Sequence, residues 1–440
     1  DAERKTFERS VAWFNNHALF LRDWRMGVIE GYQSKIDHNG RQYPRVWVRA
    51  DCLAESAMVF AYAFALTGDL DMRYKATQIM EYVWNESEPD FLQRDPESPA
   101  YGLVNWYERG PVFYGDDNAR VILPSLAVAR LLGDSRWDER IVRCILANLR
   151  TTGRLGFRRN RIDRHQFDDG KHGWRKFASE EHVSYAPHYQ SYLWAIYLWM
   201  HALTGDDVFL SRTLNAMRMT MDAYPRWTWS NGITQEIARM ILPLAFLNRI
   251  DARPEHRSWL DRMAGELSAQ MDASGAIREK LGPPGYGIFS SPASNEAYGV
   301  TEAPVIQQDD SPACDLLYTV NFSFLGLREA AGATGDLGIK QAEDRVADFL
   351  CRIQVRSEEH PYLDGTWMRS FDYRYWEYWG SSADAGWGPW CVESGWCNAW
   401  IASVLAMRCL GETLFSESLG PRIRSILPSL LDEMEIDLWR

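Results

Sequence analysis

The sequence predicts an all-α protein built from helical hairpins. Six times along the chain, an apolar stretch of helical period leads into a short Gly or Asp turn, and a second helical stretch follows it. Six hairpins that each have an apolar face bury all of those faces when the chain curls until the first hairpin meets the last. We therefore expect one (α/α)6 toroid over residues 1–440. The six turns centre on Gly68, Gly133, Gly205, Asp251, Gly335 and Gly411.

The two helices of each hairpin differ in polarity. The stretches before the turns, such as 52–66, 119–132 and 189–203, are apolar on most faces, whereas the stretch 72–84 carries charges between its apolar positions. Helices that are apolar all round belong inside a fold, and amphipathic helices belong outside it. The turns should therefore join inner helices to outer helices at one end of the ring. No Pro-, Ser- or Gly-rich linker interrupts the pattern, which favours a single domain.

Composition excludes several classes of partner. The chain has 48 basic and 60 acidic residues, a net charge of −12, which disfavours nucleic acid and anionic membrane surfaces. No apolar run reaches about 18 residues, so we expect no membrane span. Phosphate-binding loops, the GxSxG elbow and the metalloprotease helix are absent from the sequence, and the seven cysteines lack zinc-type spacing. We therefore expect neither a cofactor nor a metal.

Long connections between the hairpins are rich in aromatic residues. The chain holds 20 Trp, 20 Tyr and 18 Phe, and many of them lie between the helical stretches. Loops beyond about 12 residues are uncommon unless they are functional or disordered, and these lack the polar composition of disorder. We expect them to lie over one mouth of the ring, where their rings would stack on sugar faces. The connections span about 85–115, 151–187, 225–234, 274–313 and 357–392.

Polar residues become dense where the inner helices should begin. Six helix N-termini would converge there, and their free N–H groups favour an anion such as a substrate carboxylate. The motifs are VRADCLAES, YGDDNARV, SYAPHYQSY, TQEIAR, QQDDSPACD and VESGWCNAW.

Two of these motifs supply the candidate catalytic carboxyls. Chemistry on a glycosidic bond needs one protonated carboxyl and one ionised carboxylate on either side of the sugar. Asp116 or Asp117 and Glu236 are the first candidates, with Glu302 and Glu393 in reserve. The alternative for an acid at a helix start is an N-cap, and this applies to Asp116, Asp309 and Asp315.

Arginines accompany both acidic motifs. Asp116 and Arg120 are spaced i,i+4, and Glu236 and Arg239 are spaced i,i+3, so each pair shares a helix face and could equally be a structural ion pair. Arg49, Arg120 and Arg239 could bind a substrate carboxylate, as could His188. A lone histidine is more often a structural hydrogen-bonding group. Trp106 and Trp396 are expected to stack on the sugar, and Tyr189 or His188 would be the base of an alternative β-elimination.

The motifs FYGDDNARV, SNEAYGVTEAP and VESGWCNAW resemble those of bacterial polysaccharide-degradation proteins with (α/α)6 toroids, which include unsaturated glucuronyl hydrolases, uronate lyases and sugar epimerases. The chain looks most similar to family 154 glycoside hydrolases. That resemblance implies a β-glucuronidase-like enzyme, periplasmic or secreted, that releases a uronic acid, with glucuronic acid as the expected sugar. The alternatives are a uronate lyase and a carbohydrate-binding protein without catalysis. The segment ESGW departs from the GNGW element of unsaturated glucuronyl hydrolases, which puts their hydration mechanism in doubt here.

Overall fold

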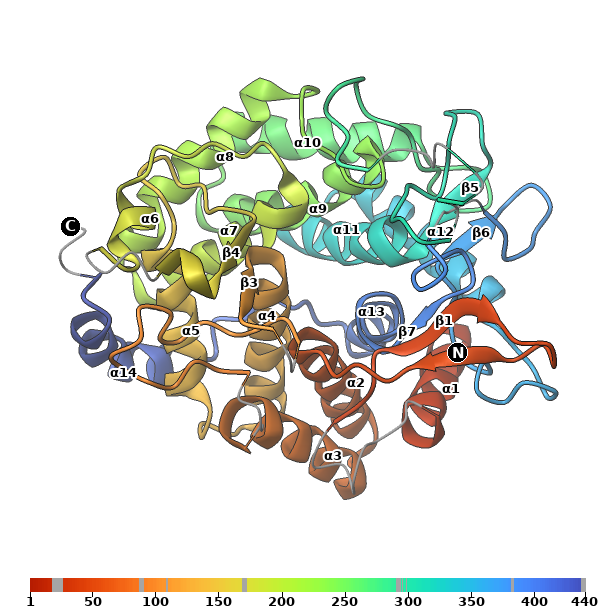
Figure 1. Ribbon diagram of the computed structural model, residues 1–440, viewed down its shortest axis with the longest axis horizontal. Helices are drawn as coiled ribbons and strands as arrows, with labels where there is room; N and C mark the ends of the chain where they lie inside the picture. Colours follow the sequence, from red (N-terminus) through yellow and green to blue (C-terminus); the bar gives the residue numbers. More distant parts are fainter. Residues whose placement is uncertain are drawn as a thin grey trace.

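A ring of six inner helices forms the centre of the computed structural model, which describes residues 1–17, 27–86, 91–107, 110–167, 172–289, 294, 296–297, 299–380 and 384–436. Each inner helix contacts the next, and the last contacts the first, so the ring is closed (Figure 1). The predicted (α/α)6 toroid is therefore confirmed. The inner helices are α2 (Ala50–Thr67), α4 (Gly115–Leu132), α7 (Pro187–Thr204), α9 (Ile233–Ile250), α11 (Asn321–Thr334) and α13 (Ala399–Leu410).

The outer ring differs from the expected one at a single position. Five outer helices follow their inner partners across the predicted turns, but α1 (Ala2–Asn16) packs on α13, and α14 (Gly420–Glu433) packs on α5 and α7 instead. The last two helices therefore do not form the sixth hairpin that the turn at Gly411 predicts. Arg422 of α14 pairs with Asp138 at 2.6 Å and ties α14 to α5. The other outer helices are α3 (Leu70–Glu81), α5 (Asp138–Arg150), α8 (Ser211–Ala223), α10 (Pro254–Ala269) and α12 (Leu337–Ile353).

Three of the turns share the sequence Thr-Gly-Asp and one geometry. At Gly205 the backbone is left-handed with φ 75°, a conformation that favours glycine and ends the helix. The Thr204 hydroxyl accepts from the Asp206 N–H at 3.2 Å, and the Asp206 carboxylate accepts from the Val208 N–H at 3.0 Å. The same bonds recur at residues 67–71 and 334–338. Each turn thus satisfies one helix end and caps the next.

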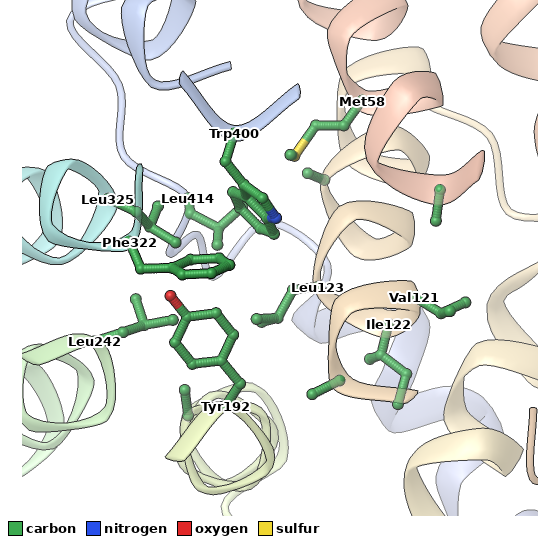
Figure 2. Packing of buried hydrophobic residues seen from close by; sticks show 14 of the residues in the cluster. Met58, Val121, Ile122, Leu123, Tyr192, Leu242, Phe322, Leu325, Trp400 and Leu414 are labelled. Carbon is green, nitrogen blue, oxygen red and sulfur yellow. The ribbon is translucent and has the colours of Figure 1, made fainter. Parts of the chain in front are cut away.

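The core lies where the inner helices meet. Figure 2 shows Tyr192 of α7 beside Phe322 of α11, with their ring centroids 5.3 Å apart, and Trp400 of α13 next to them. Among the described helices, only α2 has the length and apolar composition of a membrane span, but 78% of it is buried inside the protein. Its hydropathy is that of an inner helix in the ring.

Short strands tie the loops at the opposite end of the ring to one another. β1 (Gly31–Ile36) pairs with β2 (Gln42–Arg45) and with β7 (Val392–Glu393), which joins the two ends of the chain (Figure 1). β3 (Val112–Tyr114) pairs with β4 (Arg161–Asp163), and β5 (Ala313–Asp315) pairs with β6 (Ser370–Asp372). The loops are therefore held in place by backbone hydrogen bonds. Short helical turns complete the chain, namely η1 (Tyr82–Glu86), η2 (Arg164–Phe167), α6 (Arg175–Ser179), η3 (Asp207–Phe209), η4 (Leu316–Val320) and η5 (Ser394–Asn398).

Candidate active site

A cavity of about 450 Å³ opens at the end of the ring where the inner helices begin. Every inner helix contributes a lining residue from its first turn or from the segment just before it, and all five long connections contribute too. The predicted aromatic mouth is therefore present. Its lining residues include Arg49, Trp106, Tyr114, Asp116, Asp117, Arg161, His188, Tyr189, Glu302, Tyr318, Trp387, Glu393 and Trp396.

Three of the predicted site residues lie beneath this cavity rather than in its wall. Arg120, Glu236 and Arg239 are fully buried and do not line it. The structure thus brings all twelve predicted residues to one end of the toroid but in two layers. The layer that can contact a substrate consists of Arg49, Trp106, Asp116, Asp117, His188, Tyr189, Glu302, Glu393 and Trp396. Within the SNEAYGVTEAP motif, Asn295 and Tyr298 lie outside the described residues.

The two arginines near Asp117 are neutralised by acids of the protein. Arg49 donates to Glu30 at 3.1 Å, to Asp51 at 2.8 Å and to Asp117 at 3.0 Å. Arg120 donates to Asp117 at 3.3 Å and also contacts Asp51. The alternative of a structural ion pair between Arg120 and Asp116 is therefore wrong, because the guanidinium turns toward Asp117 and the acids of α2. This network fixes the starts of α2 and α4 relative to each other.

The neighbouring carboxyls of Asp116 and Asp117 are both harder to ionise than usual. Burial raises the pKa of both, and the adjacent Asp116 carboxyl helps to raise the pKa of Asp117 to about 8. The pair therefore retains a proton at neutral pH. Asp117 is engaged by two arginines, whereas Oδ1 of Asp116 has no hydrogen-bond partner among the described residues.

His188 is held as a neutral hydrogen-bonding group. Its Nδ1 lies 2.5 Å from the Gln235 amide nitrogen and 3.5 Å from Nη2 of Arg239. Because both of these groups are donors, Nδ1 accepts, and the ring proton belongs on Nε2, which lies 3.4 Å from Oδ2 of Asp116. Burial lowers the pKa of His188 well below its usual value, and the two nearby arginines lower it further. His188 therefore positions Asp116.

Glu236 supports the backbone below the cavity. Its Oε2 accepts from the His188 N–H at 2.7 Å, and its Oε1 accepts from the Ser230 N–H at 3.4 Å. Burial raises the pKa of Glu236 to about 8. Arg239 forms no ion pair with Glu236 in the described part of the chain; its guanidinium lies 3.7 Å from the Phe322 ring centroid and contacts His188. Glu236 and Arg239 therefore do not form the ion pair that their spacing suggested. Instead, Glu236 accepts from the backbone N–H of His188, and Arg239 contacts its ring.

Trp396 forms part of the cavity wall from a strained backbone. Its φ of 35° is unusual for a residue with a side chain. The Trp396 N–H donates to Glu55 at 2.6 Å, and the Arg120 guanidinium lies 3.3 Å from the centroid of its ring. A Cβ on the preceding Gly395 would collide with the same Glu55 carboxylate, so only glycine fits there. The buried charges below the cavity therefore set the position of this ring.

Two further carboxyls lie in the wall. Tyr318 donates its hydroxyl to Glu302 at 3.2 Å. Tyr318 leads into α11, which stands opposite α4 in the ring order, so the hydroxyl that holds Glu302 comes from the element opposite the helix that carries Asp116. Glu393 is buried, and neither of its carboxyl oxygens has a hydrogen-bond partner among the described residues. Burial raises the pKa of both groups, and Glu30 raises that of Glu393 further.

Sequence reasoning missed several residues that build the site. Glu279 accepts from the N–H groups of Thr234 at 3.1 Å and Gln235 at 3.4 Å, and so caps α9 from a distant loop. Asp315 caps η4, as the N-cap alternative predicts, with bonds from two N–H groups. Tyr318 and Arg161 lie in the short elements η4 and β4, which carry no periodic signal. No group of three or more His, Cys, Asp or Glu side chains in the described ranges could hold a metal ion.

Comparisons with known proteins show similarity at the level of the fold. No family model and no curated protein matches this chain. A sugar epimerase from a ruminal bacterium shares 11% identity over 91% of this chain and 98% of its own, with a TM-score of 0.57. Cellobiose 2-epimerase from Bacillus thermoamylovorans B4167 shares 9% identity over 92% of this chain and 100% of its own, with a TM-score of 0.58. An unsaturated glucuronyl hydrolase specific for heparin shares 10% identity over 94% of this chain and 100% of its own, with a TM-score of 0.53.

Proposed function

We propose that this protein is a carbohydrate-processing enzyme and, more narrowly, a glycoside hydrolase. The observation that carries the proposal is the set of acids in the wall of one cavity: the Asp116–Asp117 pair begins α4, and Glu302 is held by Tyr318, which leads into the opposite helix α11. Glycosidic bond cleavage needs a carboxyl on each side of the sugar, one protonated and one ionised. The sugar epimerases and the glucuronyl hydrolase that share this fold act on carbohydrates, which agrees with the proposal.

Asp116 is the best candidate for the general acid. The pair that it forms with Asp117 holds a proton, and Asp116 is a residue of the cavity wall, where its carboxyl would meet a leaving oxygen. The Nε2–H of His188 contacts the other oxygen and fixes the orientation of the carboxyl. Asp117 is held by Arg49 and Arg120 and would stabilise this arrangement.

Glu302 is the best candidate for the second carboxylate, as nucleophile or base. Burial raises the pKa of Glu302, and the nearby Arg369, the Tyr318 hydroxyl that donates to it and Arg49 offset part of this shift by favouring its ionised form. It takes the role that the sequence suggested first for Glu236, because the oxygens of Glu236 are occupied by backbone N–H groups below the cavity.

A terminal uronic acid is the substrate that we favour. The N-termini of the inner helices point to the cavity, and their partial positive charge favours an anion. Arg161 adds a cation to the wall; its side chain is 52% exposed and is bonded to Asp163 and Tyr114. The aromatic wall suits the apolar faces of a sugar ring. The resemblance to family 154 glycoside hydrolases points to glucuronic acid.

Release of glucuronic acid from 4-nitrophenyl β-glucuronide and from oligosaccharides with a terminal glucuronic acid tests this function. Asp116→Asn and Glu302→Gln should each lower kcat on the oligosaccharides by about 10²–10⁴-fold, since each removes a carboxyl that takes part in proton transfer or attack. On the aryl substrate Asp116→Asn should cost less, because 4-nitrophenolate leaves without a proton. Asp310→Asn, an exposed acid in the same connection as Glu302, is the control and should leave the rate unchanged. Wild-type rates in both catalytic variants would overturn the assignment.

The geometry weighs against the alternative of β-elimination. Burial raises the pKa of Tyr189, which disfavours the phenolate that a base would need. Both ring nitrogens of His188 are already engaged, by Gln235 and by Asp116. A lyase would produce an unsaturated product whose ultraviolet absorbance grows during the reaction, whereas hydrolysis produces none. Tight sugar binding without turnover would instead indicate a binding protein.

A further inference from the structure

Four aromatic rings extend from the cavity onto the surface of the molecule. We call this group the aromatic shelf: Trp47, Trp106, Tyr107 and Trp387. The ring of Trp47 lies 6.2 Å from that of Trp106, 5.9 Å from that of Tyr107 and 6.0 Å from that of Trp387. Trp106 and Trp387 line the cavity, whereas Trp47 does not, and Trp47 is 41% exposed. The shelf is therefore continuous with the candidate active site and leads out of it.

The shelf is rigidly built. The Arg45 guanidinium lies 3.6 Å from the centroid of the Trp387 ring and 5.4 Å from that of Trp47, so the cation supports both rings. The carbonyl of Trp47 accepts from the Glu30 N–H at 2.8 Å, and Arg49 joins Tyr107 in a β-bridge. Trp47 lies two residues after the end of β2, whose partner β1 is paired in turn with β7 (Figure 1). An exposed tryptophan held in this way costs little further conformational entropy when a ligand binds.

A second exposed aromatic on the same hairpin provides a contrast. Tyr43 of β2 is 43% exposed, nearly the same as Trp47. Its ring contacts the ammonium of Lys35 and is not among the residues that line the cavity. Both aromatic side chains are therefore exposed, but only that of Trp47 belongs to a group of rings that continues into the cavity.

We propose that the aromatic shelf binds the sugar next to the one that is cleaved, so that the substrate is a glycan chain rather than a small glucuronide conjugate. This inference rests on the proposed function. A chain whose terminal uronic acid fills the cavity must leave through the mouth, and the flat faces of the next sugar would meet Trp47 there. Aromatic rings recognise such faces through their apolar C–H groups. Trp47 is then a residue that sets specificity for chain length and has no part in the bond cleavage.

Comparison of two substrates in matched variants tests this role. Trp47→Ala should lower kcat/KM about tenfold for a tetrasaccharide with a terminal β-linked glucuronic acid and leave it unchanged for β-glucuronyl fluoride, whose leaving group is a single atom that cannot reach Trp47. Trp47→Phe should restore most of the loss, and Tyr43→Ala should change neither substrate. Equal losses on both substrates would show that Trp47 only supports the cavity wall, and no loss on either would show that the shelf binds nothing; both outcomes overturn the proposal.

A binding measurement separates this inference from the proposed catalysis. Calorimetric titration of the wild-type protein and of Trp47→Ala with a sulfur-linked analogue of the same tetrasaccharide, which is not hydrolysed, requires no turnover. If Asp116→Asn retains wild-type activity but Trp47→Ala weakens tetrasaccharide binding about tenfold, the catalytic assignment fails and the shelf stands. If Trp47→Ala binds the tetrasaccharide as tightly as the wild-type protein does, the proposal that the aromatic shelf binds a sugar is wrong, whichever residues catalyse the reaction.

Discussion

The two ends of the inner helices are built on opposite principles. At the Thr-Gly-Asp turns, local side chains satisfy the helix ends, as Thr204, Gly205 and Asp206 do with bonds inside one short stretch. At the mouth, the polar groups are buried, and their partners come from distant segments. Arg239 there has two guanidinium nitrogens without a hydrogen-bond partner among the described residues.

The charged groups at the mouth lie around the cavity, whereas Arg130 and Arg249, which also have atoms without a hydrogen-bond partner in the described ranges, lie beside the turns at Gly335 and Gly411. A buried polar group without a partner costs free energy, and several of them gather around one cavity. Glu393, Arg120 and Arg239 all lie at the mouth, and each has atoms that find no partner within the described ranges. Stable folding alone would favour their replacement by apolar residues, whereas an enzyme needs such groups to set charges and pKa values. The turns, in contrast, serve the fold.

The same substitution at the two ends should give the largest contrast. Asp51→Asn removes a charge that pairs with both Arg49 and Arg120 in the buried network, and we expect it to lower the free energy of unfolding by about 3–5 kcal/mol. Asp206→Asn at a turn should change it little, because Asn caps helices about as well as Asp. Urea unfolding followed by far-ultraviolet circular dichroism measures both. Equal changes in the free energy of unfolding for the two variants would contradict the proposed difference between the mouth and the turns.

The buried carboxyls of the mouth should make stability depend on pH. Burial raises the pKa of Glu55 and of Glu236 from 4.5 to about 8 in the folded state. A raised folded pKa contributes stability that is fully present below the unfolded pKa and is lost as pH rises through the folded pKa. The melting temperature should therefore fall between about pH 5 and pH 9. Glu236→Gln should flatten this decline, and an unchanged slope in that variant would contradict the raised pKa.

The smallest effect is expected at the turn glycines. Gly205 has φ 75°, and a Cβ added there would meet no atom within 4 Å, so Gly205→Ala tests backbone conformation alone. We expect a loss of about 1–2 kcal/mol and unchanged activity. Gly265→Ala, at an open position inside α10, should instead stabilise the protein by about 0.5–1 kcal/mol. A loss of activity in Gly205→Ala would mean that the turn end is coupled to the mouth.

Much of the site could be predicted because its residues mark local sequence patterns. Asp116, Asp117 and His188 stand at the starts of apolar helices, and closure of the ring brings those starts together. The ion pairs that these acids form with particular arginines could not be predicted in this way. Arg120 pairs with Asp51 of another helix rather than with Asp116 of its own, because contacts between helices outweigh a pair worth only a few tenths of a kcal/mol along one helix.

The sequence by itself determined the periodicity of the helices and the positions of their turns, since both depend on neighbouring residues along the chain. Tertiary structure alone decided that α1 covers α13, that Glu236 lies under the cavity and that Glu302 is held from the element opposite the helix that carries Asp116. The physical reason is the distance along the chain over which each kind of interaction acts. Helix propensity and glycine turns act over a few residues, whereas burial and charge pairing depend on which distant segments become neighbours.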